Sequence, residues 1–504
     1  MAKAKTPSYI LELELNVNPH ERKHLNKKLE AGRQIYNACL GEALKRLHVL
    51  QRDKEYRKTV ELIQNMKTSE FGADQSERKR LRALAVEIEQ SHGYSEYQLH
   101  SFVKDCQQHF LAPKVINGSG KSRQGFLIGS LEAQKLATRA FQAVEKVHYH
   151  KAEKVHFKRM DEPVSVENKC NTSGLRWKDG YVLWGELKLS VRLKRGDVFA
   201  QKAIQDKTKY IRVLKRTIRS RERFFVQLIQ EGVPPQKKRQ QGDDTVGLDI
   251  GPGTVAIVSD EQVSLRELVP NVSGEEKKLR RVERAMDRSR RANNPDNYDA
   301  NGVPKSHCTW KISRRYRKLK AKRKEIHRKL AAKRKQSHEM LANEVLSLGS
   351  NIKVETMRFQ ALQKRAKNTT RNQKNGRVNR KKRFGKSIAR HAPAMFLSIL
   401  ERKLAYEGKA LNLVNTTAVK ASQFNHVTEE YHKKQLGDRW NVIEEHRIQR
   451  DLYSAFLLWH VKEDLCSIDV QLCKQSWDSF LRLHDMEIQR IQAGKSKTLH
   501  WYIH

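Results

Sequence analysis

Three acidic residues occur where the pattern of the sequence changes. Asp249 lies inside the apolar run VGLDIGPGT, next to glycines that let a backbone or a phosphate approach closely. Glu355 ends the short apolar run NIKVE, and Asp451 opens an apolar helical run. Hard divalent cations such as Mg²⁺ prefer carboxylate oxygens, and two ions about 3.5–4 Å apart can bind the attacking and leaving oxygens of a phosphodiester. The three residues are therefore candidate catalytic residues and metal ligands.

Each of these residues also has a simpler explanation. An aspartate near the end of a strand is commonly a turn residue, and an aspartate that opens a helix is commonly its N-cap. Only the set of three, on a strongly basic chain, indicates a phosphodiester-cleaving site.

The composition points to a polyanionic partner. The chain has 504 residues, with 101 Lys and Arg against 57 Asp and Glu, and a formal net charge of +44. This charge favours nucleic acid as the partner; a basic protein without such a partner is the alternative. The start of the chain lacks the apolar segment of a secretory signal, no run is long enough to cross a membrane, and the six cysteines are scattered singly. We therefore expect a cytoplasmic protein without a disulfide framework and without a membrane partner.

The elements that would position the acidic residues follow from hydrophobic periodicity. Residues 8–18 alternate as a half-buried strand, and helical spacing runs from residue 19 to about residue 110. The loop INGSGKSRQG then interrupts the helices, and a further amphipathic helix ends near residue 147. Strands are expected between 147 and 235, the first over 147–159, and strand 8–18 is expected to join their sheet. After a linker at 234–244, a hairpin begins a buried sheet, and residues 275–345 are helical.

Two basic runs are candidate nucleic-acid contacts. Fourteen of the 25 residues from 311 to 335 are Lys or Arg, and residues 364–390 hold twelve basic residues and no acidic one. Such side chains neutralise phosphates and set affinity and salt dependence; a solvated charged face is the alternative. The candidate contacts are Arg314, Arg315, Lys318, Lys322, Arg323, Arg380, Lys381, Lys382, Arg383 and Lys386.

The segments VGLDIGPGT, KVETMRF and HRIQRDLYSAFLL together resemble the three catalytic segments of the RuvC-like nuclease domain of the TnpB family. These are transposon-encoded, RNA-guided DNA endonucleases related to type V CRISPR effectors. The segments RQIYNACLGEALKR, QKLATRAFQAVEK and RFGKSIARHAP also resemble that family.

The resemblance implies an α/β multidomain protein, with an RNase H-like (RuvC) nuclease domain, a wedge β-barrel and an inserted helical recognition lobe. It implies that Asp249, Glu355 and Asp451 bind Mg²⁺, with Mn²⁺ as a substitute. The implied divisions are 1–18 wedge strand, 19–146 recognition lobe, 147–240 wedge β-barrel, 241–414 nuclease domain with a basic helical insertion, 415–447 degenerate zinc-ribbon-like target-strand loop, 448–490 third nuclease segment and helical tail, and 491–504 C-terminal tail.

Between the last strand of the nuclease domain and the third acidic segment, the family usually carries a zinc ribbon built from CxxC pairs. This sequence departs from the family there. No cysteine occurs between Cys308 and Cys466, so the thiolate cage for tetrahedral zinc cannot form. We interpret residues 415–447 as a solvated loop and do not expect zinc; a site built from His426, His432, His446 and the nearby glutamates is the alternative.

The resemblance implies cleavage of double-stranded DNA beside a short adjacent motif, guided by a transposon-derived or CRISPR RNA, by a protein that is monomeric on that RNA. Two other hypotheses stay open. One is a cleavage-inactive, RNA-guided repressor or transposition accessory protein, and the other is a nucleic-acid-binding protein that uses no guide.

Overall fold

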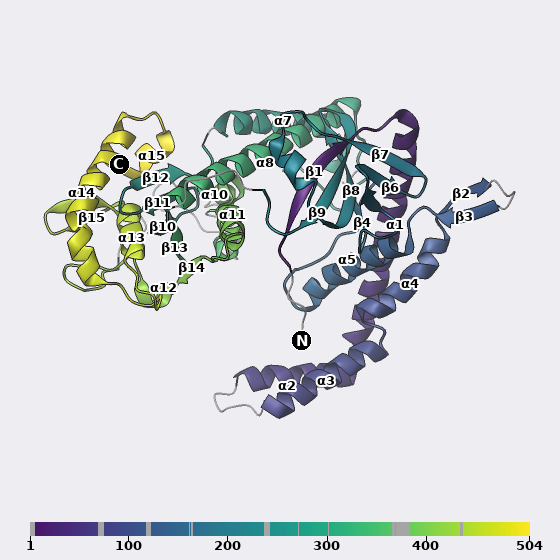
Figure 1. The fold of residues 1–504 in the computed structure, drawn as a ribbon, viewed down its shortest axis with the longest axis horizontal. Coiled ribbons are helices and arrows are strands. Elements are labelled where there is room, and N and C mark those ends of the chain that lie inside the picture. Colours follow the sequence, from purple (N-terminus) through teal and green to yellow (C-terminus); the bar gives the residue numbers. More distant parts are fainter. Residues whose placement is uncertain are drawn as a thin grey trace. The chain divides into compact units, whose positions relative to one another are not determined.

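The chain forms two compact units, Met1–Gln236 and Lys237–His504, in a computed structural model (Figure 1). The structure describes residues 6–68, 75–116, 122–160, 162, 165–235, 242–270, 272–300, 302–364, 368, 384–433 and 437–503. None of the described helices combines the length and the apolar character needed to cross a membrane. All six cysteines are free thiols.

The first unit is built on an antiparallel seven-stranded sheet. Its order is β4-β8-β9-β1-β7-β6-β5, so the strand expected over residues 8–18 lies inside the sheet, between β9 and β7. Its alternate residues Tyr9, Leu11 and Leu13 are buried, as a period of two requires. The strands are β1 (Ser8–Leu15), β4 (Ser165–Glu167), β5 (Arg176–Lys178), β6 (Tyr181–Trp184), β7 (Leu187–Arg192), β8 (Thr208–Ile218) and β9 (Arg221–Glu231).

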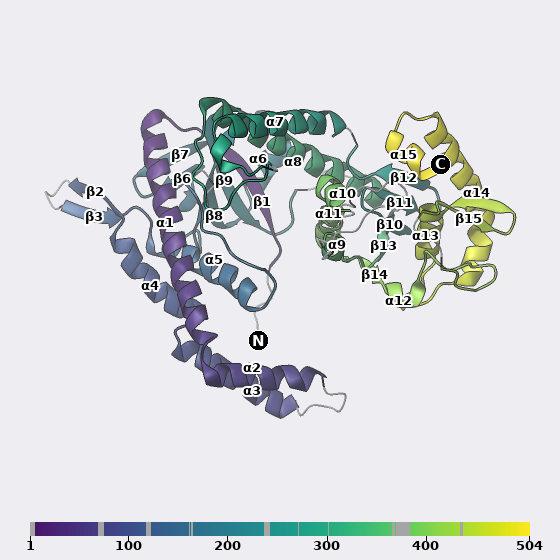
Figure 2. The same ribbon diagram turned by 180° about the vertical axis from the view of Figure 1, so that it is seen from behind.

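Helices form most of the chain between β1 and β4. The first, α1 (Pro19–Leu50), begins with a capping box, in which Asn18 and Glu21 each accept the other's backbone N–H at 2.8 Å. It packs along α5, as both views show (Figures 1 and 2). The other elements of this unit are α2 (Lys54–Thr68), α3 (Gln75–Ser91), α4 (Glu96–Gln108), the hairpin β2 (Leu111–Ile116) and β3 (Ser122–Phe126), α5 (Ser130–His148) and α6 (Val198–Ala203).

The strand expected over residues 147–159 is wrong. Helix α5 continues to His148, and the chain beyond it runs along α1 without joining a sheet. Side chains of α1 take up its backbone groups: Arg33 Nη1 donates to the Lys158 carbonyl at 2.8 Å, and the Lys158 N–H donates to Asn37 Oδ1 at 2.9 Å. The partly buried residues Ala152, Val155 and Lys158 recur every third residue here, so the alternation in the sequence does not correspond to a buried face.

The second unit contains a mixed five-stranded sheet of order β12-β11-β10-β13-β14. β10 (Asp244–Ile250), β11 (Thr254–Val258) and β12 (Val263–Glu267) form an antiparallel meander, whereas β13 (Gly349–Glu355) lies parallel to β10 and to β14 (Asn412–Val414). The remaining elements are α7 (Ser273–Ala292), η1 (Pro295–Asn297), α8 (Arg314–Leu348), α9 (Phe359–Leu362), α10 (Gly385–His391), α11 (Pro393–Ala405), α12 (Thr416–Val419), β15 (Trp440–Ile443), β16 (His446–Gln449), α13 (Arg450–Trp459), α14 (Val470–Ala493) and α15 (Lys497–Ile503).

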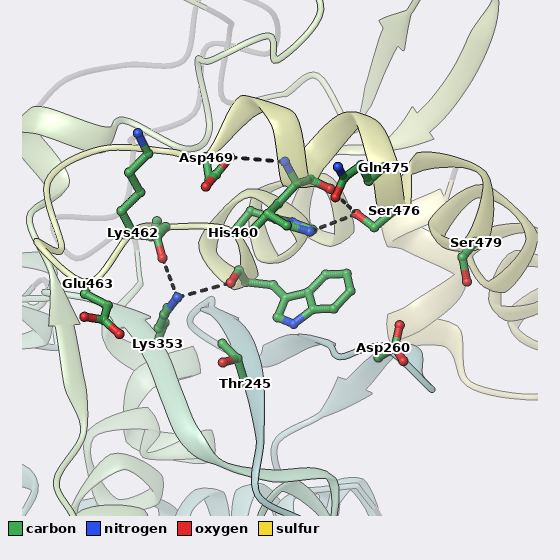
Figure 3. Close-up of a pocket in the computed structure, with 13 residues that line it drawn as sticks. Thr245, Asp260, Lys353, His460, Lys462, Glu463, Asp469, Gln475, Ser476 and Ser479 are labelled. Atoms are coloured by element: carbon green, nitrogen blue, oxygen red, sulfur yellow. Dashed lines mark hydrogen bonds between the residues drawn. The ribbon is translucent and has the colours of Figure 1, made fainter.

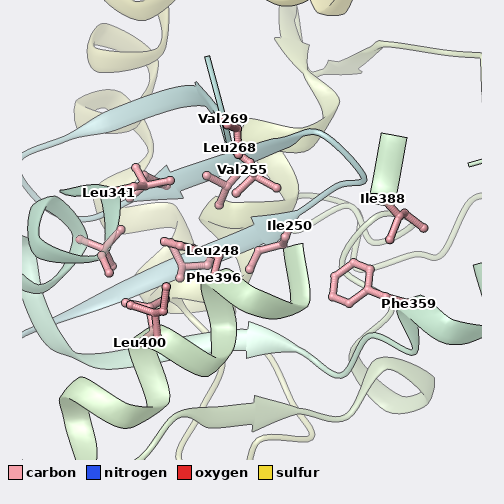
Figure 4. Packing of buried hydrophobic residues seen from close by; sticks show 14 of the residues in the cluster. Leu248, Ile250, Val255, Leu268, Val269, Leu341, Phe359, Ile388, Phe396 and Leu400 are labelled. Carbon is pink, nitrogen blue, oxygen red and sulfur yellow. The ribbon is translucent and has the colours of Figure 1, made fainter. Parts of the chain in front are cut away.

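Helices cover both faces of this sheet. On one face, Leu248 and Ile250 of β10 pack with Leu341 of α8 and with Phe396 and Leu400 of α11 (Figure 4). The opposite face carries a second core, made with α13 and α14. Because side chains alternate along a strand, residues 247 and 249 of β10 and residues 353 and 355 of β13 face α13.

Candidate active site at the end of the parallel strands

Asp249 and Glu355 lie side by side on neighbouring parallel strands. Leu248 of β10 pairs with Val354 of β13, so the next residue on each strand is one of the two acids. Neighbouring strands are about 4.8 Å apart, and both acids face α13, since Leu248 and Val354 belong to the opposite core. The order of the strands therefore gathers two carboxylates that are far apart in the sequence.

Gly247 lets α13 lie close to β10. A Cβ at this position would lie 2.1 Å from the carbonyl oxygen of Ala455 and 2.5 Å from the backbone nitrogen of Trp459. Asp249 is two residues, or about 7 Å, further along the strand, and Asp451 is one helical turn, or about 6 Å, before Ala455. The close contact of glycine and helix therefore brings Asp451 to the end of the sheet where Asp249 lies.

The far end of α13 is held by the same sheet. Lys353, which precedes Glu355 on the face toward α13, donates from Nζ to the carbonyl oxygens of Trp459, at 3.4 Å, and Val461. A cation is favourable at the carbonyl end of a helix. Burial lowers the pKa of Lys353. β13 thus carries Glu355 toward the start of α13 and Lys353 at its carbonyl end.

The charges at this end of the sheet repel one another. Burial and then the negative charges of Asp451 and Glu355 raise the pKa of Asp249 well above its ordinary value, and Arg450 opposes the rise. Burial also raises the pKa of Glu355. The guanidinium of Arg450 lies 3.4 Å from Asp451 Oδ1 and is the nearby compensating charge. Crowded carboxylates with one cation beside them are a donor set that fits a hard divalent ion.

The three predicted ligands share this end of the sheet without forming a closed cage. Among the residues that the structure describes, no group of three His, Cys, Asp or Glu side chains is close enough together to hold a metal ion. The charges of Asp451 and Glu355 nevertheless contribute to the raised pKa of Asp249, as expected of carboxylates that share one end of a sheet.

Two residues that the sequence did not single out, Tyr502 and Arg439, are linked to the acidic end of the sheet. Tyr502 of α15 has its pKa raised by burial and by the charges of Asp451 and Asp249, while a hydrogen bond from Thr254 acts in the opposite direction. Arg439 accepts the backbone N–H of Arg450 on its carbonyl oxygen at 2.9 Å. No local pattern marks these positions, because they reach the site from other elements.

The predicted basic contacts fall into two groups. Five of them lie in α8 and are exposed, and none forms an ion pair with a described carboxylate: Arg314, Arg315, Lys318, Lys322 and Arg323. Arg380, Lys381, Lys382 and Arg383 lie outside the described residues, and Lys386 belongs to α10, but its side chain is not described. The first group is compatible with phosphate binding, since its charges are not neutralised within the described chain.

The interpretation of residues 415–447 as a solvated loop is wrong. Val419, Ala421 and Phe424 are buried in the core with α13, and so is Ile443 of the β15–β16 hairpin. His426 is also buried, and its Nδ1 lies 2.8 Å from the Tyr453 hydroxyl. The apolar residues of this segment are spaced too irregularly to predict a packed element.

Two buried histidines of this core make folding stability sensitive to acid. Burial lowers the pKa of His426 and of His460 to about 4. The unfolded chain therefore binds more protons between pH 6.5 and pH 4. The free energy of unfolding is therefore highest above pH 6.5, where both histidines are neutral in the folded and unfolded chain. It decreases as the pH falls toward 4, by at most about 3 kcal/mol for each histidine. Urea unfolding at pH 7 and pH 5 measures this loss.

The matched control is His460→Asn. His460 Nδ1 donates to the Phe456 carbonyl at 2.9 Å, and an asparagine amide can supply that donor without titrating. In this variant, the free energy of unfolding should differ less between pH 7 and pH 5 than it does in the wild type. An unchanged difference would contradict the contribution of His460 to the loss of stability in acid.

A cavity of about 590 Å³ lies at the carbonyl end of α13 (Figure 3). Lys353, His460 and Ser476 line it, and the Ser476 hydroxyl is 2.8 Å from His460 Nε2. None of the three predicted acids lines it. This cavity is thus separate from the acidic site, which occupies the other end of the helix.

No family model and no curated protein matches the chain. Among solved structures, the chain is similar to one described as the Cas12f1–sgRNA–target DNA complex, at 12% identity, over 89% of this chain and 98% of that chain, with a TM-score of 0.40. It is also similar to a CRISPR–Cas12f ternary complex, at 12% identity, over 90% of this chain and 83% of that chain, with a TM-score of 0.24.

Proposed function

We propose that this protein is an RNA-guided, Mg²⁺-dependent DNA endonuclease of the TnpB type, whose second unit is an RNase H-like (RuvC) nuclease. The observation that carries the proposal is the arrangement of β10, β13 and α13. Two acids lie in register on adjacent parallel strands, and a helix seated on Gly247 brings a third. A sheet with an antiparallel meander followed by two parallel strands is the order expected of that fold.

In this proposal, Asp249, Glu355 and Asp451 hold the metal through carboxylate oxygens. A bound divalent ion would activate water and stabilise the negative charge on the phosphodiester. The protein's own part is positional: the sheet fixes Asp249 and Glu355, and α13 fixes Asp451. Arg450 limits the repulsion among the acids.

The net charge of +44 and the unpaired cations of α8 support guide RNA and target DNA as the partners. The protein would recognise the shape of the RNA–DNA heteroduplex, and base pairing would read the sequence.

The test of guided recognition is to sequence the RNA that co-purifies with the protein expressed with its native flanking DNA. A discrete RNA, with a constant scaffold and an end that matches sequence outside the locus, is the expected result. A heterogeneous mixture of host RNA would overturn guided recognition and favour a nucleic-acid-binding protein without a guide.

A cleavage-inactive, RNA-guided DNA-binding protein is the second candidate. The absence of a closed three-ligand cluster among the described residues favours it. Nicking of a matched target on addition of Mg²⁺ separates the two candidates, because the second predicts binding without any cut.

The exposed cations of α8 should set the salt dependence of binding. Arg314, Lys318 and Lys322 follow one another at helical spacing. Replacing all three with alanine should lower the slope of log affinity against log salt by about 2–3 for a DNA duplex, since each phosphate contact contributes about 0.9. Fluorescence anisotropy across a salt series measures the slope.

Lys333→Ala is the control, because Lys333 Nζ is already paired with Glu275 at 2.7 Å. Its slope should match that of the wild type. An unchanged slope in the triple variant would exclude this part of α8 from the phosphate contacts.

A further inference from the structure

The C-terminal helix α15 is fixed to the nuclease unit. Leu499 and Ile503 are buried in the same core as α13. Ser496 accepts the backbone N–H of Leu499 at 3.2 Å, and its hydroxyl donates to Glu267 Oε1 of β12 at 3.0 Å. The helix therefore has a defined position beside the sheet that carries the acids.

One side chain of this helix is exposed where its neighbours are not. Trp501 is 60% exposed, whereas Tyr502, the next residue, is partly buried. The charges of Asp451 and Asp249 contribute to the raised pKa of Tyr502. The two rings meet edge to face, with centroids 5.1 Å apart. The indole thus packs against Tyr502 and keeps most of its surface open to solvent.

Arg439 holds this pair of rings in place. Its guanidinium carbon is 4.1 Å from the centroid of the Trp501 ring and 4.7 Å from that of Tyr502. Its carbonyl oxygen accepts the N–H of Arg450, the residue before Asp451. This backbone hydrogen bond therefore connects Arg439, and with it the two rings, to the start of α13.

The chemistry of this stack favours a nucleic acid over a protein surface. Arg439 forms no ion pair with a carboxylate in the part of the chain that the structure describes, so its charge is not neutralised there. A flat, immobilised aromatic ring beside an unpaired cation suits a base and its phosphate, and every base offers a π-face to stack on.

We propose that Trp501 is a stacking platform for a nucleobase of the single strand that enters the acidic site. This inference rests on the proposed function, because it takes the strand to be cut as the occupant. Tyr502 and Arg439 act as positioning residues, and they hold the indole at the site.

The test is a stacking measurement with the full-length protein, without divalent ions and at elevated salt. The probe is a short single-stranded oligothymidylate that carries 2-aminopurine, whose fluorescence is quenched when the base stacks. High salt weakens the phosphate contacts but leaves stacking largely intact. We expect quenching by the wild type and about ten-fold weaker binding with little quenching for Trp501→Leu.

Trp501→Phe is the matched control, because it keeps an aromatic face where leucine keeps only apolar bulk. It should retain most of the quenching. Thermal unfolding of both variants should match that of the wild type, since the indole is largely exposed. Equal quenching and affinity in Trp501→Leu and the wild type would overturn the platform.

The assay separates this inference from the proposed function. Quenching is measured without divalent ions and requires no cleavage, so it reports on stacking and not on the nuclease. Quenching that depends on Trp501 in a protein that never cuts would refute the nuclease and leave the platform standing. Cleavage that depends on Asp249, without quenching that depends on Trp501, would support the nuclease and overturn the platform.

Discussion

Replacing Asp249 with asparagine is expected to abolish metal-dependent cleavage and to stabilise the second unit. The neutral amide removes a ligand charge, which should lower the cleavage rate by about 10³-fold or more. It also relieves the burial of a carboxylate and its repulsion by Asp451 and Glu355, the causes of its raised pKa. Plasmid cleavage and thermal unfolding of the same preparations measure the two effects.

Asp260→Asn is the control for this variant. Asp260 is an exposed carboxylate in the same unit and lines the cavity at the other end of α13. Its replacement should leave both cleavage and the melting temperature unchanged. Wild-type cleavage by Asp249→Asn, or a lower melting temperature, would contradict the account of the acidic site.

Replacing Gly247 with alanine is expected to lower both the stability of the second unit and its cleavage activity. The new Cβ would meet backbone atoms of Ala455 and Trp459 at 2.1 and 2.5 Å, and backbone atoms cannot move without moving α13. Overpacking of this kind typically costs about 1–3 kcal/mol. Because α13 carries Asp451, cleavage should fall in the molecules that remain folded. Urea unfolding gives the first quantity, and the cleavage rate per folded protein gives the second.

Gly274→Ala controls for the general effect of adding a methyl group. Nothing lies within 4 Å of a Cβ at Gly274, in the first turn of α7, so the free energy of unfolding should stay within about 0.5 kcal/mol of the wild type. The same small change in Gly247→Ala would show that close contact of α13 and β10 is not required.

Local patterns in the sequence were sufficient to predict several strands and their ends. The alternation of residues 8–18 predicted β1 and its place in the first sheet. The run around Asp249 predicted the β10–β11 hairpin, and the change of pattern at Glu355 predicted the end of β13. These signals work because a strand with one or two buried faces constrains each residue along it.

Contacts between distant segments were not predictable from one sequence. Residues 147–159 alternate as a strand, but the segment begins inside α5, and its Lys158 is bonded through both backbone groups to side chains of α1. The segment around Phe424 looked polar and solvated, yet it packs against α13. Arg439 and Tyr502 lie far from Asp249 along the chain, and only the fold brings them near it.

Cleavage of matched and mismatched plasmids by the purified protein with its co-purified RNA tests the central claim most directly. With Mg²⁺, we predict cutting of a plasmid that carries the sequence matched by the RNA and an adjacent motif, no cutting of a plasmid with a scrambled match, and no cutting by Asp249→Asn. Cutting of both plasmids alike, or cutting of the matched plasmid by Asp249→Asn, would contradict the claim.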